Sequence, residues 1–283
     1  MPRQCQRFNS TDSIKLWEAL VNKEEFARNF SAPAGAPLYG RPPYIYRGVE
    51  DIIIRYEADT QKVREMLPPG VEPADDPAVC TAWGRWIPFS SFGPYHEAYV
   101  MVRVIHAGVT YLYQPVILVD NEVGLAAGRE IWGYAKKMAH FHRGSGDDHY
   151  GYGEQILFKV DRPLGQPVMT ATMVRDSRAD AADLGPDLPI LSCRIIPAAD
   201  GSRRPSVAEL VRLDVTAHLH EGPDGKPEFY AGRAQLKLEG GAADPWNKLA
   251  PTRILGGYYG VFDFDLGGGR VVHDYRDDED IWE

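Results

Sequence analysis

Short segments rich in β-branched and aromatic residues follow one another along most of the sequence and predict a fold built from strands. Turn signals such as Asp75-Asp76-Pro77 and Pro223-Asp224-Gly225 separate them. About a dozen strands without a regular alternation of strand and helix argue against a Rossmann or TIM architecture and favour a closed or nearly closed antiparallel sheet. The predicted strands are Glu50–Glu57, Ala78–Trp86, Ala98–His106, Tyr111–Asp120, Glu122–Ala127, Gln155–Asp161, Val168–Asp176, Leu188–Ile196, Leu210–His220, Arg233–Leu238, Arg253–Phe264 and Arg270–Tyr275.

Two helices are also predicted. Asp12–Phe30 has apolar residues at helical spacing after a group of cap candidates, and Thr60–Leu67 is a short helical segment that Pro68-Pro69-Gly70 would end. Ser31–Tyr44 is rich in proline and glycine, which predicts a linker or a wrapping arm. No internal repeat is visible, and no domain boundary is predicted after Tyr44.

The composition restricts the compartment and the partners. Forty acidic residues against 31 basic ones give a net charge of −9, which argues against a nucleic-acid partner. Three widely spaced cysteines (Cys5, Cys80 and Cys193) favour a reducing compartment over a disulfide framework or a zinc site. The sequence has no recognisable signal peptide and no run of about 20 apolar residues. A cytoplasmic, soluble protein without a membrane partner is therefore expected.

The segment Gly128–Phe141 (GREIWGYAKKMAHF) places Lys136 and Lys137 among large apolar residues. Lysine is almost never fully buried unless it is paired or functional. A desolvated amine beside a second cation loses its proton more readily and becomes a nucleophile. A solvated strand edge that carries two protective lysines is the structural alternative. The segment alone leaves both interpretations open.

Other candidate motifs carry less information. The pairs His140/His142 and His218/His220 could each present two imidazoles to a metal from one strand face. Because no further ligand spacing accompanies them, polar strand faces are the favoured interpretation, and no metal site is predicted. Glu97 lies at the entrance of an apolar strand, where it is either solvent-facing or catalytic.

Several segments, in the same order along the chain, resemble sequence motifs of the acetoacetate decarboxylase superfamily. Gly128-Arg129-Glu130 followed by Tyr134–Lys137 is similar to the family's wording, GRE and then PKK, although Ala135 replaces the proline. The likeness extends from about Tyr39 to Tyr275 and leaves the N-terminal helix and the acidic tail outside. Its further segments are Pro42-Pro43-Tyr44, Val168–Met173, Arg194–Leu210, Asp244–Ile254 and Val272–Tyr275.

The resemblance implies a mainly β (α+β) fold, an antiparallel closed or cone-like β-barrel with a few peripheral helices. Residues 45–276 would form this domain, preceded by a helix and a proline- and glycine-rich arm (1–44) and followed by an acidic tail (277–283). It also implies homo-oligomers and a Schiff-base lysine in a mostly apolar cavity, without a metal or an organic cofactor. By position Lys136 is the nucleophile and Lys137 its neighbouring cation.

The family's other cavity residues are only partly retained. An ungapped alignment puts Val49 where the family has an arginine, Ala82 where it has one glutamate, and Glu97 where it has a second. Arg47 would share a strand face with position 49 if the strand is regular. The further candidates for substrate binding are Arg85, Gln114, Trp132 and Tyr134.

The expected function is that of a lysine Schiff-base lyase acting on a keto acid or ketone. An iminium at Lys136 would serve as an electron sink for decarboxylation, or for aldol, retro-aldol or dehydration chemistry, with Glu97 moving protons. The alternative is a non-catalytic barrel that binds a small molecule. On a regular strand Lys136 and Lys137 would point to opposite faces, and Lys137 would then act weakly. The sequence determines neither the substrate nor the oligomer size.

Overall fold

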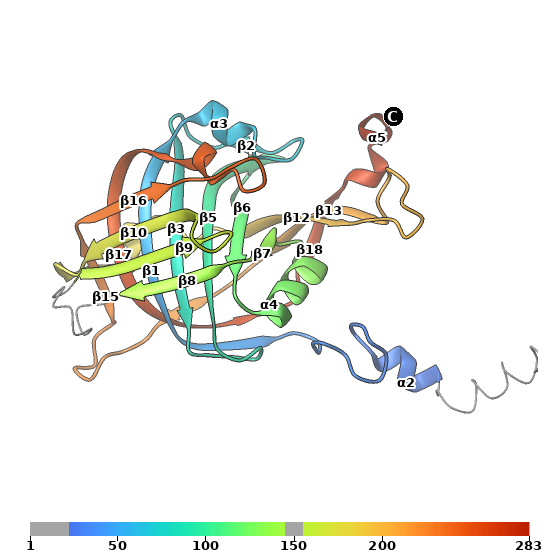
Figure 1. The fold of residues 1–283 in the computed structure, drawn as a ribbon, viewed down its shortest axis with the longest axis horizontal. Coiled ribbons are helices and arrows are strands. Elements are labelled where there is room, and N and C mark those ends of the chain that lie inside the picture. Colours follow the sequence, from blue (N-terminus) through green and yellow to red (C-terminus); the bar gives the residue numbers. More distant parts are fainter. Residues whose placement is uncertain (1–22, 145–154, 283) are drawn as a thin grey trace, which may run out of the picture. The chain divides into compact units, whose positions relative to one another are not determined.

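The computed structural model describes residues 23–144 and 155–282 (Figure 1). It divides the chain into two compact units, Met1–Pro42 and Pro43–Glu283. No helix in the described part of the chain is long and apolar enough to cross a membrane.

The described part of the first unit holds one short helix and a loop. Helix α2 (Lys23–Arg28) ends two residues before the predicted end at Phe30, and the predicted residues 12–22 lie outside the described residues. In the loop, Ser31 Oγ donates to the carbonyl of Tyr39 (2.8 Å) and accepts from its amide (3.1 Å). As expected from its prolines, the arm has no strand before Tyr44.

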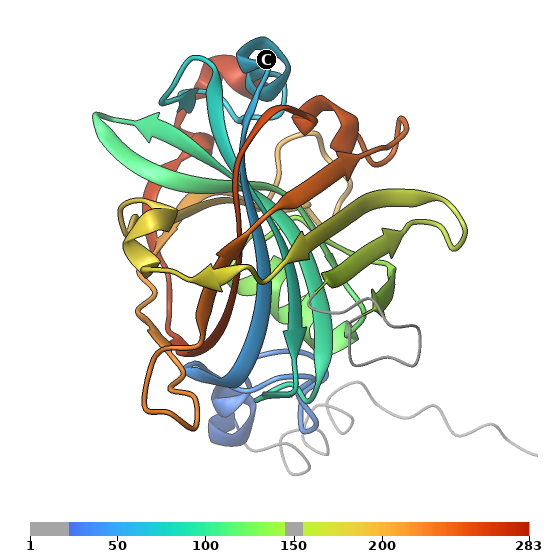
Figure 2. The same ribbon diagram turned by 90° about the vertical axis from the view of Figure 1, so that its left-hand side faces the viewer.

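The second unit consists of a 14-stranded sheet and a four-stranded sheet (Figure 2). The small sheet has the order β16-β10-β9-β8 and contains β8 (His140–Gly144), β9 (Gln155–Asp161), β10 (Pro167–Val174) and β16 (Ala234–Leu238). The large sheet contains β1 (Tyr44–Ala58), β2 (Glu72–Pro73), β3 (Ala78–Ile87), β4 (Phe89–Ser90), β5 (Tyr95–His106), β6 (Val109–Val119), β7 (Lys136–Met138), β11 (Ser177–Arg178), β12 (Ile190–Ile196), β13 (Val207–Leu213), β14 (Ala217–Leu219), β15 (Phe229–Gly232), β17 (Pro251–Leu266) and β18 (Arg270–Asp274).

Helices are few and short in this unit. The α-helices are α3 (Thr60–Arg64), α4 (Glu122–Ala127) and α5 (Glu279–Trp282). A π-helical turn, η1 (Gly128–Trp132), continues α4, and the 3₁₀ turns are η2 (Ala181–Leu184), η3 (Trp246–Leu249) and η4 (Tyr275–Asp277). At the end of the chain, Trp282 Nε1 donates to the carbonyl of Tyr275 (2.8 Å).

The prediction of a mainly β fold with a few helices is confirmed. The large sheet follows the path β11-β15-β17-β1-β3-β5-β6-β12-β13-β18, and in the described part of the chain no pairing joins its two ends. Closure of the barrel is therefore not confirmed. Pairing is mostly antiparallel, but β6 pairs in parallel with both β7 and β12.

The prediction of a strand at Glu122–Ala127 is wrong, because this segment is helix α4. Asn121 caps the helix, since its side chain accepts a hydrogen bond from the amide of Gly124 (2.8 Å). The short apolar sequence fits a buried strand and a buried helical turn equally well. This helix and η1 form the crossover that lets β7 lie parallel to β6.

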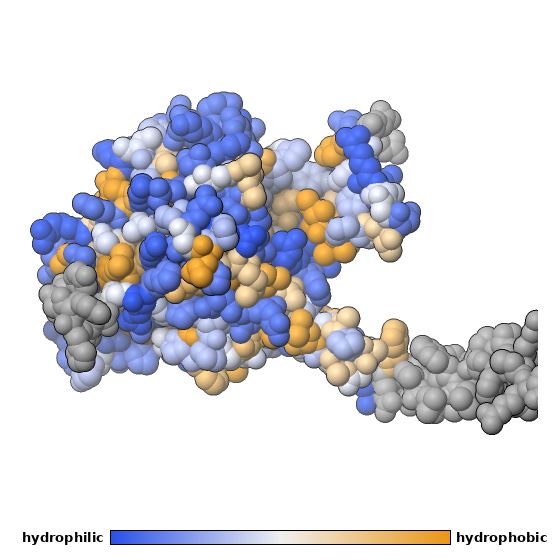
Figure 3. All heavy atoms as spheres, viewed as in Figure 1, coloured by the Kyte–Doolittle hydropathy of each residue, from blue (hydrophilic) through white to orange (hydrophobic). Residues whose placement is uncertain are grey.

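Alternating residues of the large sheet face two different cores. On β1, Ile52 and Ile54 pack with residues of the small sheet such as Phe158, whereas Val49 and Ile53 belong to a second cluster on the opposite face. The second cluster surrounds the candidate site. On the face seen in Figure 3, hydrophobic residues form patches among hydrophilic ones.

Candidate active site

Lys136 is the first residue of β7 and reaches the sheet directly after the η1 turn. Its backbone lies beside Ile117 of β6, and Arg129 Nη1 donates to its carbonyl (3.2 Å). A Cβ added at Gly128 would lie 2.7 Å from Lys136 Cδ and 2.8 Å from Cε. The glycine of the GRE segment therefore leaves the space that the Lys136 side chain occupies.

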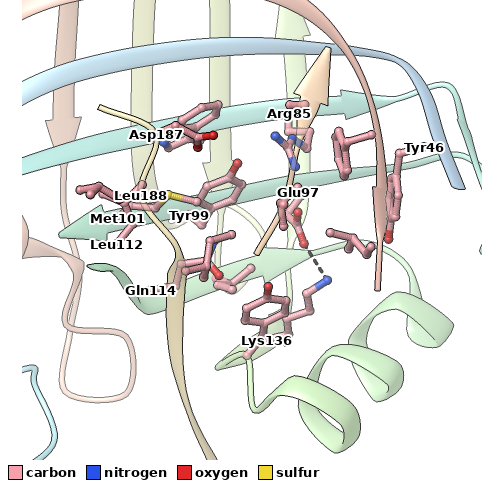
Figure 4. Close-up of a pocket in the computed structure, with 18 of the residues that line it drawn as sticks. Tyr46, Arg85, Glu97, Tyr99, Met101, Leu112, Gln114, Lys136, Asp187 and Leu188 are labelled. Carbon is pink, nitrogen blue, oxygen red and sulfur yellow. Dashed lines mark ion pairs between the residues drawn. The ribbon is translucent and has the colours of Figure 1, made fainter. Parts of the chain in front are cut away.

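The Lys136 amine pairs with a buried carboxylate. Lys136 Nζ lies 2.7 Å from Glu97 Oε1, and the two side chains are only 6% and 10% exposed (Figure 4). Glu97 is on β5, directly opposite Arg85 of β3, which in turn is opposite Asp51 of β1. Two carboxylates and two cations therefore compensate one another on one face of the sheet.

Arg85 contributes a partly buried cation beside this pair. Its Nε and Nη2 donate to the two carboxylate oxygens of Asp51, both at 2.8 Å, and its guanidinium lies 4.9 Å from the centre of the Phe264 ring. Burial alone would lower the pKa of Arg85, but the Asp51 carboxylate raises this pKa well above its ordinary value. Arg85 thus stays charged. Because the two bonds to Asp51 use Nε and Nη2, its Nη1 can donate to another partner.

Tyrosines surround the amine. Lys136 Nζ lies 5.8 Å from the ring centre of Tyr95 and 5.9 Å from that of Tyr134. The hydroxyls of Tyr46 and Tyr95 are hydrogen-bonded (3.1 Å). Burial raises the pKa of Tyr95, Tyr134 and Tyr46 well above the ordinary value. All three hydroxyls therefore stay protonated. One hydroxyl of the Tyr46–Tyr95 pair donates to the other, so the second hydroxyl of the pair and that of Tyr134 can donate to an oxygen of a ligand.

These side chains line a cavity of about 160 Å³, here called the lysine cavity. Gln114 also lines it, and in the described part of the chain its buried Oε1 has no hydrogen-bond partner. A bulge places one extra residue of β6 between the pairs Val100–Val116 and Val102–Tyr113. It explains why Gln114 and Ile117, an odd number of residues apart, line the same cavity.

Lys137 lies outside the lysine cavity. Its side chain is 41% exposed, and its Nζ pairs with Asp244 Oδ1 (2.9 Å) and donates to the carbonyl of Ala243. Arg162 shares the Asp244 carboxylate (3.1 Å). Successive strand residues point to opposite faces, so the two lysines have separate partners.

Two further predicted site residues do not line the lysine cavity. Arg47 pairs with Asp265 (2.8 Å) with its side chain 44% exposed, because a bulge interrupts β1 between Tyr46 and Val49 at Gly48, whose φ is +62°. The bulge removes the shared face that a regular strand would have given Arg47 and Val49. Trp132 is buried behind the cavity, where its Nε1 donates to the carbonyl of Gly267 (3.0 Å).

Val49 and Ala82, the two positions where the resemblance leads us to expect an arginine and a glutamate, lie on opposite faces of the large sheet. Val49 is fully buried in the cluster around the lysine cavity. Ala82 is fully buried on the other face of the sheet, while its neighbours Thr81 and Trp83 face the cavity side. Neither position supplies a polar group to the lysine cavity.

The sequence interpretation missed Asp51, Tyr46 and Tyr95. Alternation along β5 from Glu97 would have indicated Tyr95, since the two share a face. Asp51 could not be found this way, because its partner Arg85 is on another strand.

The histidine pairs carry no metal site among the described residues, where no group of three or more His, Cys, Asp or Glu side chains could hold a metal ion. His142 lies 3.4 Å from Asp161, and His220 lies 3.8 Å from Asp263. In both contacts the histidine side chain is 49% exposed.

Comparison with known proteins identifies similar chains. A family model described as acetoacetate decarboxylase (ADC) matches residues 31–276. Acetoacetate decarboxylase 2 of Mesorhizobium japonicum is 31% identical over 258 residues, which cover 88% of this chain and 90% of that protein. The crystal structure of acetoacetate decarboxylase from Legionella pneumophila is 26% identical with a TM-score of 0.76, covering 89% of this chain and 95% of the other. The enduracididine biosynthesis enzyme MppR, complexed with pyruvate, shares the fold at 21% identity and a TM-score of 0.71, with 87% and 98% covered.

Proposed function

Since the chain belongs to the acetoacetate decarboxylase family, we propose that it is a lysine Schiff-base lyase that acts on a keto acid, with Lys136 as the nucleophile. The observation that carries the proposal is the 2.7 Å pair of Lys136 and Glu97, buried together in the lysine cavity. A buried lysine needs a partner or a function. Here its partner is also a group that can take up its proton.

The first step prepares the nucleophile. Transfer of one proton from Lys136 to Glu97 leaves a neutral amine beside a neutral carboxylic acid, in a site where separated charges are poorly solvated. The amine then attacks the ketone carbon. Proton return from Glu97 to the carbinolamine hydroxyl allows water to leave and forms the iminium.

Decarboxylation follows from the iminium. The carbon–carbon bond to the carboxylate breaks, CO2 leaves, and the electron pair moves into the iminium to give an enamine. The enamine carbon takes up one proton from solvent, which Glu97, a carboxylate again after water has left, can accept and pass on. Water then hydrolyses the new iminium to the product ketone. The Schiff base itself is the electron sink, so this chemistry requires neither a metal nor an organic cofactor.

Arg85 favours a keto acid over a neutral ketone. The guanidinium remains charged, and its Nη1 is left over from the two bonds to Asp51. A substrate carboxylate placed there would gain a charge-assisted hydrogen bond. Gln114 and Tyr134 line the same cavity and offer further polar contacts. The same iminium could also support aldol cleavage or dehydration, which product analysis distinguishes from loss of CO2.

Reductive trapping tests the proposal. The protein is incubated with acetoacetate or with acetone, reduced with borohydride, and digested for mass spectrometry. We expect an adduct on Lys136, none in Lys136→Arg, and release of CO2 only with acetoacetate. Lys137→Arg is the matched control and should still be trapped at Lys136. Absence of an adduct across a panel of keto acids and ketones would reject the proposal in favour of a non-catalytic binding protein.

We extend the proposal to the organisation of the protein. Residues 45–276 would form a closed, cone-like barrel, with residues 1–44 as an N-terminal helix and arm and 277–283 as a tail. The protein would work as a homo-oligomer in the cytoplasm. Sedimentation of the full chain tests the oligomer.

A further inference from the structure

A second cavity adjoins the lysine cavity on the same face of the large sheet. Its volume is about 230 Å³, and we call it the side cavity. Figure 4 shows the shared residues Met101, Leu112, Asp187 and Leu188 at the end of the lysine cavity away from Lys136. The residues that line both cavities are Trp83, Met101, Leu112, Asp187, Leu188 and Ala217.

Strand β5 connects the two cavities. Its alternating residues Glu97, Tyr99, Met101 and Arg103 share one face. Glu97 and Tyr99 line the lysine cavity, Met101 lines both, and Arg103 lines the side cavity. Six residues of extended strand span about 20 Å. The two cavities therefore follow each other along the strand and together are much longer than a substrate of the size of acetoacetate.

Trp83, which lines both cavities, presents a flat and fixed surface. The ring of Trp83 stacks on that of Tyr99, with the ring centres 5.5 Å apart and the planes at 14°. Trp83 Nε1 donates to Thr81 Oγ1 (2.8 Å), which holds the indole in place. An apolar or flat chain can lie against this surface, where burial of its apolar area would contribute to binding.

The far end of the side cavity carries two guanidinium groups. Arg55 and Arg103 both line it, and among its lining side chains only the exposed Asp187 carries a negative charge. Arg103 Nη1 lies 3.5 Å from Asp75, but its buried Nε has no hydrogen-bond partner in the described part of the chain. A buried donor without an acceptor is unfavourable, and a ligand oxygen would remove that cost.

We propose that the two cavities form one site for an extended β-keto acid, whose ketone carries an apolar tail that ends in a carboxylate. This inference rests on the proposed function. The keto-acid end lies between Lys136 and Arg85, the tail passes Trp83 and Met101, and the distal carboxylate reaches Arg103. Acetoacetate would leave the side cavity unfilled.

A substrate series tests the length and the charge of the tail. Acetoacetate, 3-oxotetradecanoate and 3-oxotetradecanedioate are compared by CO2 release, because a chain of this length is needed to reach from Lys136 to Arg103. We expect kcat/KM to rise by about ten-fold or more from acetoacetate to 3-oxotetradecanoate, because the added methylenes are buried. A further rise of about ten-fold is expected for the diacid, which is the effect of one hydrogen bond to a charged group. Equal or higher kcat/KM for acetoacetate would overturn the inference.

Two matched variants locate the tail. Leu184 lines the side cavity and not the lysine cavity, whereas Leu164 is 65% exposed on the small sheet's β9–β10 turn. Leu184→Trp should lower the ratio of kcat/KM for 3-oxotetradecanoate over acetoacetate by about ten-fold, and Leu164→Trp should not change it. Arg103→Met should remove the preference for the diacid. An unchanged ratio in Leu184→Trp would contradict the placement of the tail.

A ligand without a ketone separates this inference from the proposed function. Tetradecanedioate cannot form a Schiff base, so its affinity does not depend on the chemistry of Lys136. Its affinity is measured by calorimetry and compared with that of butanoate. If tetradecanedioate binds more tightly and Leu184→Trp weakens this binding, the extended site is supported even if trapping fails. Trapping at Lys136 without any preference for long substrates or ligands rejects the extended site and leaves the proposed function standing.

Discussion

Lys136 and Lys137 are neighbours in the chain, and their surroundings differ in almost every physical respect. Lys136 is 6% exposed and pairs with Glu97, which is 10% exposed. Lys137 is 41% exposed and pairs with Asp244 near the surface. Both amines have a carboxylate within 3 Å, so an ion pair by itself does not distinguish them. Burial does, because the amine of Lys136 is largely shielded from solvent whereas that of Lys137 is not.

The difference also shows what each lysine requires from the rest of the fold. The position of Lys136 depends on the space left at Gly128 and on the hydrogen bond that Arg129 donates to its backbone carbonyl. Its amine also needs the carboxylate of Glu97, which lies on a strand far away in the sequence. Lys137 needs only a partly exposed partner. A substitution that affects Lys136 should therefore change the chemistry, and one that affects Lys137 should change stability slightly.

Removal of the buried carboxylate should give the largest effect. Glu97→Gln keeps the size of the side chain but takes away the proton acceptor of Lys136, so we expect kcat to fall by about 10²–10⁴-fold. Trapping by borohydride should slow in parallel. The melting temperature provides the control for folding. A loss of less than about ten-fold would remove Glu97 from proton transfer.

Loss of the space beside Lys136 should give an intermediate effect. In Gly128→Ala the new methyl group meets Lys136 Cδ at 2.7 Å, so the amine must shift, and a displacement of about 1 Å can cost about 10²-fold in kcat/KM. Gly124→Ala in α4 is the matched control, because its Cβ has no neighbour closer than 3.4 Å. Equal activity of the two variants would contradict the packing argument.

The smallest effect is expected at Lys137. Lys137→Met breaks a partly exposed ion pair with Asp244, which Arg162 still contacts, and should lower the free energy of unfolding by about 0–1 kcal/mol. The pH–rate profile should keep its position, because Lys137 lies outside the lysine cavity. Denaturant unfolding and a pH series of kcat measure both. A shifted profile would show that the second lysine acts on the first after all.

Much of the fold could be predicted from the sequence. Most of the long strands, such as β1, β3, β6, β9 and β17, lie close to predicted segments, because alternating and β-branched patterns report local structure directly. The predicted strand Leu210–His220 is divided between β13 and β14, and the short strands β2, β4, β7, β8, β11 and β15 were not predicted. Helix α4 was predicted as a strand, since a six-residue apolar segment lacks the length that separates the two patterns. The Asn121 cap was the available signal for a helix.

The residues of the candidate site could likewise be predicted only in part from the sequence. Motif matches alone selected Lys136, Glu97 and the family, and Arg85, Gln114 and Tyr134 were among the candidates. Arg47, selected on the assumption of a regular strand, and Trp132 were also candidates, yet the structure places them outside the lysine cavity. Which face a side chain takes depends on every bulge between it and the site, and bulges are defined by pairing with distant strands.

By itself, the sequence determined that the chain folds mainly into strands, that it belongs to this family and that Lys136 is the reactive candidate of the pair. Only the tertiary structure decided which carboxylate Lys136 meets, that Arg85 is held by Asp51 beside it, and that Lys137 lies outside. The physical reason is that strand patterns and motifs are local properties. Burial and pairing of charges arise where segments far apart in the chain come together, and here the α4–η1 crossover brings Lys136 to the face that carries Glu97.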